Sequence, residues 1–142
     1  MKKKLLIVCF LFFLEENLKS YDHIWDKIKA YNENNSFYID INNIIQMDGY
    51  TQFWELIDYS VKDEYGDLSA KILIQGDCKY FRFKWLKVSY HKFPMAKDTT
   101  QTKDPSEAYK HWHYPPTKST SAKILEYVCA IAGVSIWFTN FR

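Results

Sequence analysis

The most regular pattern of apolar and polar positions lies between Ser69 and Cys78, where the two kinds of residue alternate. One parity carries small and apolar residues, namely Ala70, Ile72, Ile74, Gly76 and Cys78. The other parity is mostly polar, with Ser69, Lys71, Leu73, Gln75 and Asp77. A period of two residues is that of a β-strand, whose side chains point alternately to opposite faces of a sheet. This segment is therefore predicted to be a strand with one buried face.

Other strand-like segments, separated by turn signals, surround this one. The predicted strands are residues 23–30, which alternate only loosely, 36–40, 52–60 and 80–91. Asp48-Gly49 is typical of a hairpin turn. The apolar residues of the long aromatic strand change parity near Trp85-Leu86, which predicts a β-bulge there. Residues 42–47 are assigned to one helical turn or a loop, and residues 97–106 to a polar loop, with a short edge strand as the alternative.

Near the end of the chain the period becomes helical. Within residues 120–132, apolar side chains recur on one helix face, namely at Ala122, Leu125, Val128, Cys129 and Ala132. Ser119 or Thr120 can cap the first turn, and Gly133 can end the helix. Because an apolar helix face has to be buried, we expect it to pack against the sheet. Short antiparallel strands followed by one helix predict an α+β fold.

The first 20 residues have the composition of a secretory signal peptide. Three lysines precede ten apolar residues, Leu5 to Leu14, and a polar stretch follows. Ten helical residues span about 15 Å, half of a ~30 Å hydrocarbon core, so a membrane anchor fits less well. A buried element of the fold is the other alternative. We therefore expect residues 1–20 to direct export, residues 21–133 to form one domain and residues 134–142 to be an apolar extension.

The positive charge of the chain lies in this predicted signal segment. The formal net charge of the whole chain is +2, but residues 1–20 hold four of the lysines and only two of the acidic residues. The rest of the chain is therefore neutral and lacks the basic footprint of a nucleic-acid-binding protein. We expect no nucleic-acid partner, and membrane contact only through the signal segment.

Two cysteines lie on the faces that are predicted to meet. Cys78 is on the apolar face of its strand, and Cys129 is on the apolar face of the helix. The third cysteine, Cys9, belongs to the signal segment, so an even number remains after export. In an exported domain such a pair is expected to form a disulfide. The alternatives are two separate buried thiols, or a catalytic or metal-binding role.

Several short motifs follow one another in a fixed order along residues 24–132. They are Phe37-Tyr38-Ile39-Asp40, Trp54-x-Leu56-x-Asp58-Tyr59, Ser69-x-Lys71, Asp77-Cys78, Arg82, Tyr90, Met95, Trp112 with Pro115-Pro116, and Val128-Cys129. Together they resemble the surface-adhesin protein E family of small exported bacterial proteins. The resemblance implies an antiparallel sheet of about six strands, with the C-terminal helix on its concave face and a disulfide between the two matched cysteines. The chain departs from the family pattern after Met95, where a glycine is usual.

The resemblance also implies a non-catalytic binding or adhesion module of the bacterial cell envelope. Named members of the family bind host extracellular-matrix and serum proteins, so we expect extracellular-matrix or envelope proteins as partners, with no cofactor. Aromatic residues make up 18% of the chain, and rigid rings on a sheet suit protein binding. The expected location is the periplasm, the outer-membrane surface or the medium. Open sheet edges make a homodimer an additional expectation.

The segment His111-Trp112-His113 supplies the alternative function. Two histidines at this spacing lie on one face of an extended segment, where they can share a metal or a haem iron. A third ligand is not evident, although His91 is the nearest candidate in sequence. The alternative is therefore a periplasmic haem or metal carrier that uses His111 and His113. The chain contains no P-loop, dinucleotide-binding loop or zinc-protease motif, and no nucleophile elbow.

Overall fold

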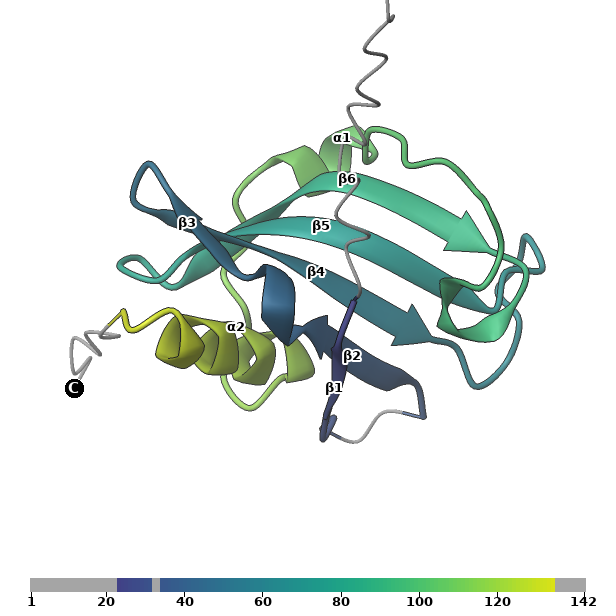
Figure 1. Ribbon diagram of the computed structural model, residues 1–142, viewed down its shortest axis with the longest axis horizontal. Helices are drawn as coiled ribbons and strands as arrows, with labels where there is room; N and C mark the ends of the chain where they lie inside the picture. Colours follow the sequence, from purple (N-terminus) through teal and green to yellow (C-terminus); the bar gives the residue numbers. More distant parts are fainter. Residues whose placement is uncertain (1–22, 32–33, 135–142) are drawn as a thin grey trace, which may run out of the picture.

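The computed structural model describes residues 23–31 and 34–134, which form one sheet, two α-helices and two short 3₁₀ turns (Figure 1). The strands are β1 (Trp25–Ile28), β2 (Ser36–Asp40), β3 (Ile45–Met47), β4 (Tyr50–Asp58), β5 (Ser69–Asp77) and β6 (Arg82–His91). The helical elements are η1 (Ile41–Asn43), η2 (Pro94–Ala96), α1 (Glu107–Lys110) and α2 (Thr120–Ile131).

The six strands form one antiparallel sheet in the order β1-β2-β4-β5-β6, and β3 also pairs with β4. Strand β4 is long enough for two partners along one edge, because β2 pairs with residues 55–58 and β3 with residues 50–52. Asp48 and Gly49 connect β3 to β4 with φ values of 53° and 81°. Two positive φ values are those of a tight hairpin turn, so the predicted Asp-Gly turn is confirmed.

The predicted bulge in the last strand is present. Leu73 pairs with Lys87 and the next residue, Ile74, pairs with Trp85, so Leu86 has no partner on β5. Because of this extra residue, the apolar side chains before and after the bulge point to the same face of the sheet. As a result, Trp85 before the bulge packs into the same core as Val88 after it.

Helix α2 covers one face of the sheet, here called the covered face (Figure 1). The hydroxyl of Ser119 accepts a hydrogen bond from the Ala122 N–H at 3.1 Å, and Gly133 follows the helix with a φ of 70°. Both ends therefore lie where the sequence predicted them. The buried core between α2 and the sheet contains Ile28, Phe37, Ile39, Phe53, Ala70, Ile72, Ile74, Val88, Ile124 and Val128.

A disulfide joins α2 to the end of β5. Cys78 and Cys129 are 51 residues apart in sequence, and their Cα atoms are 5.8 Å apart. Leu125 packs against the pair, and a Cβ atom built on Gly76 would come within 2.8 Å of the Leu125 Cδ1 atom. The glycine thus lets the helix approach the strand closely. The predicted fold, a six-stranded antiparallel sheet with a disulfide-linked C-terminal helix, is confirmed.

The segment 42–47 is more structured than predicted. It contributes to the turn η1, whose first N–H groups are capped by the Asp40 carboxylate, and to the strand β3. All three side chains of β3 are exposed. A strand without a buried face has no alternation to detect, so its position follows from the adjacent hairpin turn instead. The assignment of 42–47 to a helical turn or a loop was therefore incomplete.

The predicted polar loop 97–106 contributes a single bridge to the sheet rather than an edge strand. Lys103 exchanges two backbone hydrogen bonds with Val88, at 2.9 and 2.8 Å. His113 does the same with Phe83, again at 2.9 and 2.8 Å. The free edge of β6 is thus covered at two points.

The predicted signal peptide, residues 1–20, lies outside the described residues, as does the predicted extension beyond Val134. These boundaries therefore stay predictions. Within the described ranges, no helix combines the length and the apolar composition needed to cross a membrane.

Candidate binding surface on the open face of the sheet

The face of the sheet opposite α2, here called the open face, carries aromatic, polar and basic side chains. The strand register places on it Trp25, Lys27, Tyr38, Gln52, Trp54, Lys71, Leu73, Gln75, Arg82 and Lys84. The short helix α1 does not cover this face, because its Tyr109 ring stacks at 3.9 Å on Trp85, which packs into the core of the covered face. Most of these side chains are half-buried, which leaves part of each ring and amide accessible.

A pocket of about 380 Å³ lies on the open face. It is lined by His23, Asn43, Ile45, Gln52, Trp54 and Leu73. The His23 ring stacks on Trp25 at 5.0 Å and meets Trp54 edge-on at 6.3 Å. Pockets of this size with apolar walls and a few polar groups are typical of sites that take a small group or a side chain.

The buried carboxylate of Asp40 fixes one wall of this pocket. It accepts hydrogen bonds from the backbone N–H groups of Ile24, at 3.2 Å, and Asn42, at 3.3 Å. It also bonds the side-chain amide of Asn43 at 2.5 Å and contacts the Nδ1 atom of His23. One side chain of β2 therefore holds the segment before β1 and the turn η1 in place, so the pocket is pre-formed.

Cationic groups lie over aromatic rings at three places on the open face. The Nζ atom of Lys27 is 5.7 Å from the Tyr38 ring centroid, and that of Lys71 is 5.2 Å from the Trp54 centroid. The Trp112 ring faces Arg82 at 4.5 Å and Lys84 at 4.8 Å. Such contacts attract a cation to the electron-rich face of a ring.

Partial burial affects the ammonium group of Lys71. Desolvation lowers the pKa of Lys71, and the nearby charge of Asp40 opposes this effect. The cation is thus held beside the pocket in surroundings that only partly compensate for its lost hydration.

The three side chains of the segment His111-Trp112-His113 lie in different surroundings. Trp112 lies with Tyr50 at 5.5 Å and with the cations of the open face. The His113 ring instead lies 5.8 Å from Phe83, and its Nε2 atom is 2.8 Å from the Ala108 carbonyl oxygen. His111 is exposed. His91 is a residue of β6 and belongs to a separate buried network.

Among the described residues, no group of three His, Cys, Asp or Glu side chains is placed to hold a metal ion. The carrier hypothesis therefore gains no support from the described geometry, and binding at His111, Trp112 and His113 stays a prediction.

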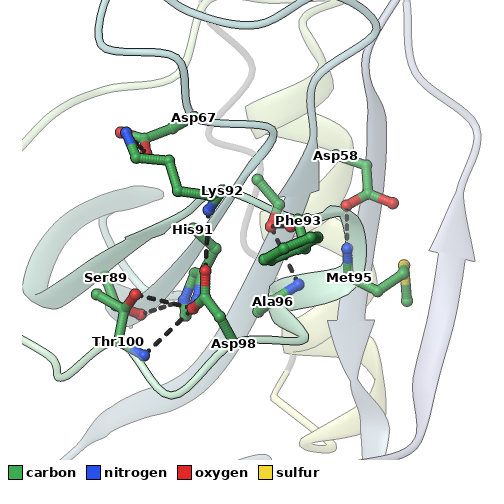
Figure 2. A network of polar contacts seen from close by, with 11 residues as sticks. Asp58, Asp67, Ser89, His91, Lys92, Phe93, Met95, Ala96, Asp98 and Thr100 are labelled. Atoms are coloured by element: carbon green, nitrogen blue, oxygen red, sulfur yellow. Dashed lines mark hydrogen bonds and ion pairs between the residues drawn. The ribbon is translucent and has the colours of Figure 1, made fainter.

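A buried polar network lies at the end of the open face under the loop after β6 (Figure 2). The Ser89 hydroxyl is 2.8 Å from His91 Nε2, and His91 Nδ1 contacts the Asp98 carboxylate. Asp98 also accepts hydrogen bonds from the N–H of Lys92, at 2.9 Å, and the hydroxyl of Thr100, at 2.8 Å. These bonds hold the pKa of Asp98 well below its ordinary value, with His91 the main cause.

The order serine, histidine and aspartate is also that of a hydrolytic triad, but the surroundings differ from those of an active site. Only 1% of Ser89 and 2% of His91 is exposed, so a substrate has no access to the hydroxyl. The network instead ties the loop to the strand. The sequence contained one sign of this network, because Ser89 and His91 are two residues apart on a predicted strand and therefore lie on the same face.

The comparisons with known proteins decide the family. Residues 25–130 match the family model of surface-adhesin protein E. The chain belongs to this family. No curated protein and no solved structure matches it. Membership in the surface-adhesin protein E family supports a surface adhesion-type role and an exported or surface-exposed location. It also suggests a non-enzymatic role that depends on binding host or other protein partners.

The departure from the surface-adhesin protein E pattern after Met95 has a structural counterpart. Ala96, at the position where the resemblance implied a glycine, has a φ of 51°, and Met95 has a φ of 58°. The Met95 N–H donates to Asp58 at 2.6 Å (Figure 2), and the Ala96 N–H donates to the Ser69 hydroxyl at 3.0 Å. Two side chains of the sheet therefore hold a backbone conformation that favours glycine.

Sequence reasoning identified the disulfide but not the pocket or the cations over rings. Trp54 and Lys71 belong to different strands, so the alternation within each strand does not show that they share a face. Only the β4–β5 register places both side chains on the open face. The sequence did indicate that Lys71 lies on the polar face of its predicted strand. Pairing that residue with Trp54 required knowledge of which strands are neighbours.

Proposed function

We propose that this surface-adhesin protein E family member is a non-catalytic binding module that presents the open face of its sheet to protein partners. In this proposal residues 1–20 act as a signal peptide, and the domain of residues 21–133 acts in the cell envelope or outside the cell. Extracellular-matrix or envelope proteins are the expected partners.

The observation that carries the proposal is the position of Trp54 at the centre of the open face. Its ring lines the pocket, meets His23 and lies under the Lys71 ammonium group. Half-buried tryptophans on a rigid scaffold give a large contact area with little loss of conformational freedom, and they are enriched at the centres of protein interfaces. Trp25 and Trp112 extend this aromatic surface to either side.

The substitution Trp54→Ala tests the proposal. We expect it to weaken binding to at least one member of a panel of immobilised extracellular-matrix and serum proteins by about tenfold or more, the usual effect of losing an aromatic anchor. Binding is measured by biolayer interferometry on the purified, exported chain. Tyr65→Ala is the matched control, because Tyr65 is 74% exposed on the loop between β4 and β5, away from the pocket.

A circular-dichroism melt of each variant shows whether the fold is intact. Loss of binding in a folded Trp54→Ala variant, with binding retained in Tyr65→Ala, supports the open face as the binding surface. Equal binding by the parent chain and folded Trp54→Ala would refute the proposal for this face.

A further inference from the structure

Three lysines of the open face, Lys27, Lys71 and Lys84, lie over aromatic rings without a carboxylate at ion-pair distance among the described residues. Most other cations with a recorded polar contact are paired with carboxylates. Lys87 bonds Asp104 at 2.5 Å, and Lys92 bonds Asp67 at 2.7 Å. Lys27, Lys71 and Lys84 thus place three ammonium groups without an ion-pair partner in the described ranges on the surface that carries the pocket, while Lys79, Lys103 and Lys123 lie over rings elsewhere.

The position of Lys71 makes this arrangement costly for the free protein. Its ammonium group is partly desolvated beside Trp54 and the pocket, and the nearby charge of Asp40 opposes this unfavourable effect only in part. An anionic group of a ligand that approached from the open face would compensate for this loss. The site is therefore complementary to negative charge.

Neutral hydrogen-bonding groups lie between these cations. Gln52 and Gln75 face each other across β4 and β5 in direct register. Neither amide has a hydrogen bond to another described residue. Amides beside the half-buried rings of Trp54 and Trp112 can bond hydroxyl groups, while the accessible parts of the rings contact the apolar faces of pyranose units. Ammonium, amide and aromatic groups together match an acidic carbohydrate better than they match a uniformly charged phosphate chain.

The spacing of the lysines favours a polymer over a single sugar. Lys27 and Lys71 are three strand positions apart, which corresponds to about 14 Å. Lys84 pairs with Gln75, four residues along β5 from Lys71, so these two lysines are also about 14 Å apart. A ligand that contacts all three must carry several negative groups along its length.

We propose that the open face binds a linear sulfated polysaccharide, whose sulfate groups contact Lys27, Lys71 and Lys84. Sulfate esters keep their charge at all physiological pH values, and hydroxyl groups between them bond Gln52 and Gln75. This inference rests on the proposed use of the open face for binding, but it assigns that face a second class of ligand. No amide or ammonium group of the covered face takes part.

Heparin is the probe for this proposal. Binding to the purified, exported chain is measured by isothermal titration at several salt concentrations. We expect each of the substitutions Lys27→Gln, Lys71→Gln and Lys84→Gln to weaken heparin binding about fivefold or more. The plot of log K against log salt concentration has a negative slope. In the triple variant the magnitude of this slope should decrease by about three, because three charge contacts are lost.

Matched controls exist within the chain. Lys103 lies 5.1 Å from the Tyr90 ring centroid and Lys123 lies 5.5 Å from that of Tyr31, but neither belongs to the open face. Lys103→Gln and Lys123→Gln remove the same charge and the same type of contact, so we expect less than a twofold effect. Equal losses in these controls and in the open-face variants would overturn the site and indicate non-specific attraction.

Competing ligands distinguish the chemistry. Neutral dextran should not displace heparin, whereas dextran sulfate should. Displacement of heparin by single-stranded DNA or by anionic lipid vesicles at equal charge concentration would overturn the assignment to a carbohydrate. If folded parent chain binds the protein panel through Trp54 but does not bind heparin, this inference fails and the proposed protein-binding function stands.

Discussion

Met95 and Ala96 are two consecutive non-glycine residues in the left-handed region of backbone conformation. For an L-residue this conformation costs roughly 1–2 kcal/mol relative to the right-handed one. The loop keeps it because Asp58 and Ser69 accept hydrogen bonds from the two N–H groups. A local cost is thus offset by bonds to the sheet.

We predict that Ala96→Gly stabilises the protein. Glycine adopts a φ near 51° without the Cβ clash, although its greater freedom in the unfolded chain cancels part of the gain. The net increase in the free energy of unfolding should be about 0.5–1 kcal/mol, measured by urea denaturation. The control Ala130→Gly, on the exposed side of α2, should instead lower it by up to about 1 kcal/mol. A decrease for both variants would contradict this account of the loop.

We predict that Asp98→Asn lowers stability at neutral pH and that the loss shrinks in acid. Bonds from His91, Thr100 and Lys92 hold the pKa of Asp98 below its ordinary value of 3.8. The unfolded chain therefore binds this proton first as pH falls, so the carboxylate stabilises the fold above pH 3.8 and this stabilisation disappears in acid.

Urea midpoints of the parent chain and Asp98→Asn between pH 7 and pH 3 test this prediction. The two curves should converge as the solution becomes more acidic. Asp48→Asn is the control, because Asp48 lies in an exposed hairpin turn whose positive φ asparagine also tolerates. A constant difference between parent and Asp98→Asn across this range would show that the carboxylate charge does not matter.

At the scale of elements, side-chain periodicity located most of the strands and the helix. The alternation in 69–78 and the helical period in 120–132 were clear because each element buries one face. Strand β3 was missed because its side chains are exposed on both faces. The candidate surface was missed for another reason, since it forms only when Trp54 and Leu73 become neighbours in the sheet register.

The disulfide links the two elements whose contact makes the core. It closes a separation of 51 residues between Cys78 and Cys129. In the chain-entropy model a loop of this length stabilises the fold by about 4 kcal/mol, by reducing the freedom of the unfolded chain. Against a typical total of roughly 5–15 kcal/mol this is a large fraction.

We predict that the double substitution Cys78→Ser and Cys129→Ser lowers the free energy of unfolding by several kcal/mol and exposes α2 to proteases. Urea denaturation gives the free energy, and mass spectrometry of limited digests locates the first cuts. Replacing both cysteines avoids a reactive single thiol. A melting temperature equal to that of the parent chain would contradict a stabilising role for the bond.

At the scale of the whole molecule, the two edges of the sheet differ in how far other segments cover them. Backbone bridges from Lys103 and His113 cover parts of the β6 edge. On the opposite side the sheet ends in β1 and in β3, and β3 has exposed Ile45 and Met47 side chains and no second strand partner among the described residues. Unpaired edges with apolar side chains promote association with other chains. A covering segment or a second copy is therefore expected there.

The end of the described chain lies close to this edge. The Gln46 side chain of β3 donates a hydrogen bond to the Ala132 carbonyl oxygen at 2.9 Å, two residues before Val134. The eight residues that follow, 135–142, can span up to about 26 Å if extended, which is more than the length of β3. The predicted apolar extension is thus within reach of the β3 edge of its own domain.

We predict that this extension covers the β3 edge, and that a chain ending at Val134 self-associates more strongly than the full chain. Sedimentation velocity at several protein concentrations measures the difference. Adding Ile45→Lys to the truncated chain should restore the monomer, because an edge lysine opposes strand pairing between copies. Identical monomeric profiles for the full and truncated chains would contradict the prediction. A dimeric full chain with a monomeric truncated chain would instead identify residues 135–142 as the contact of a homodimer.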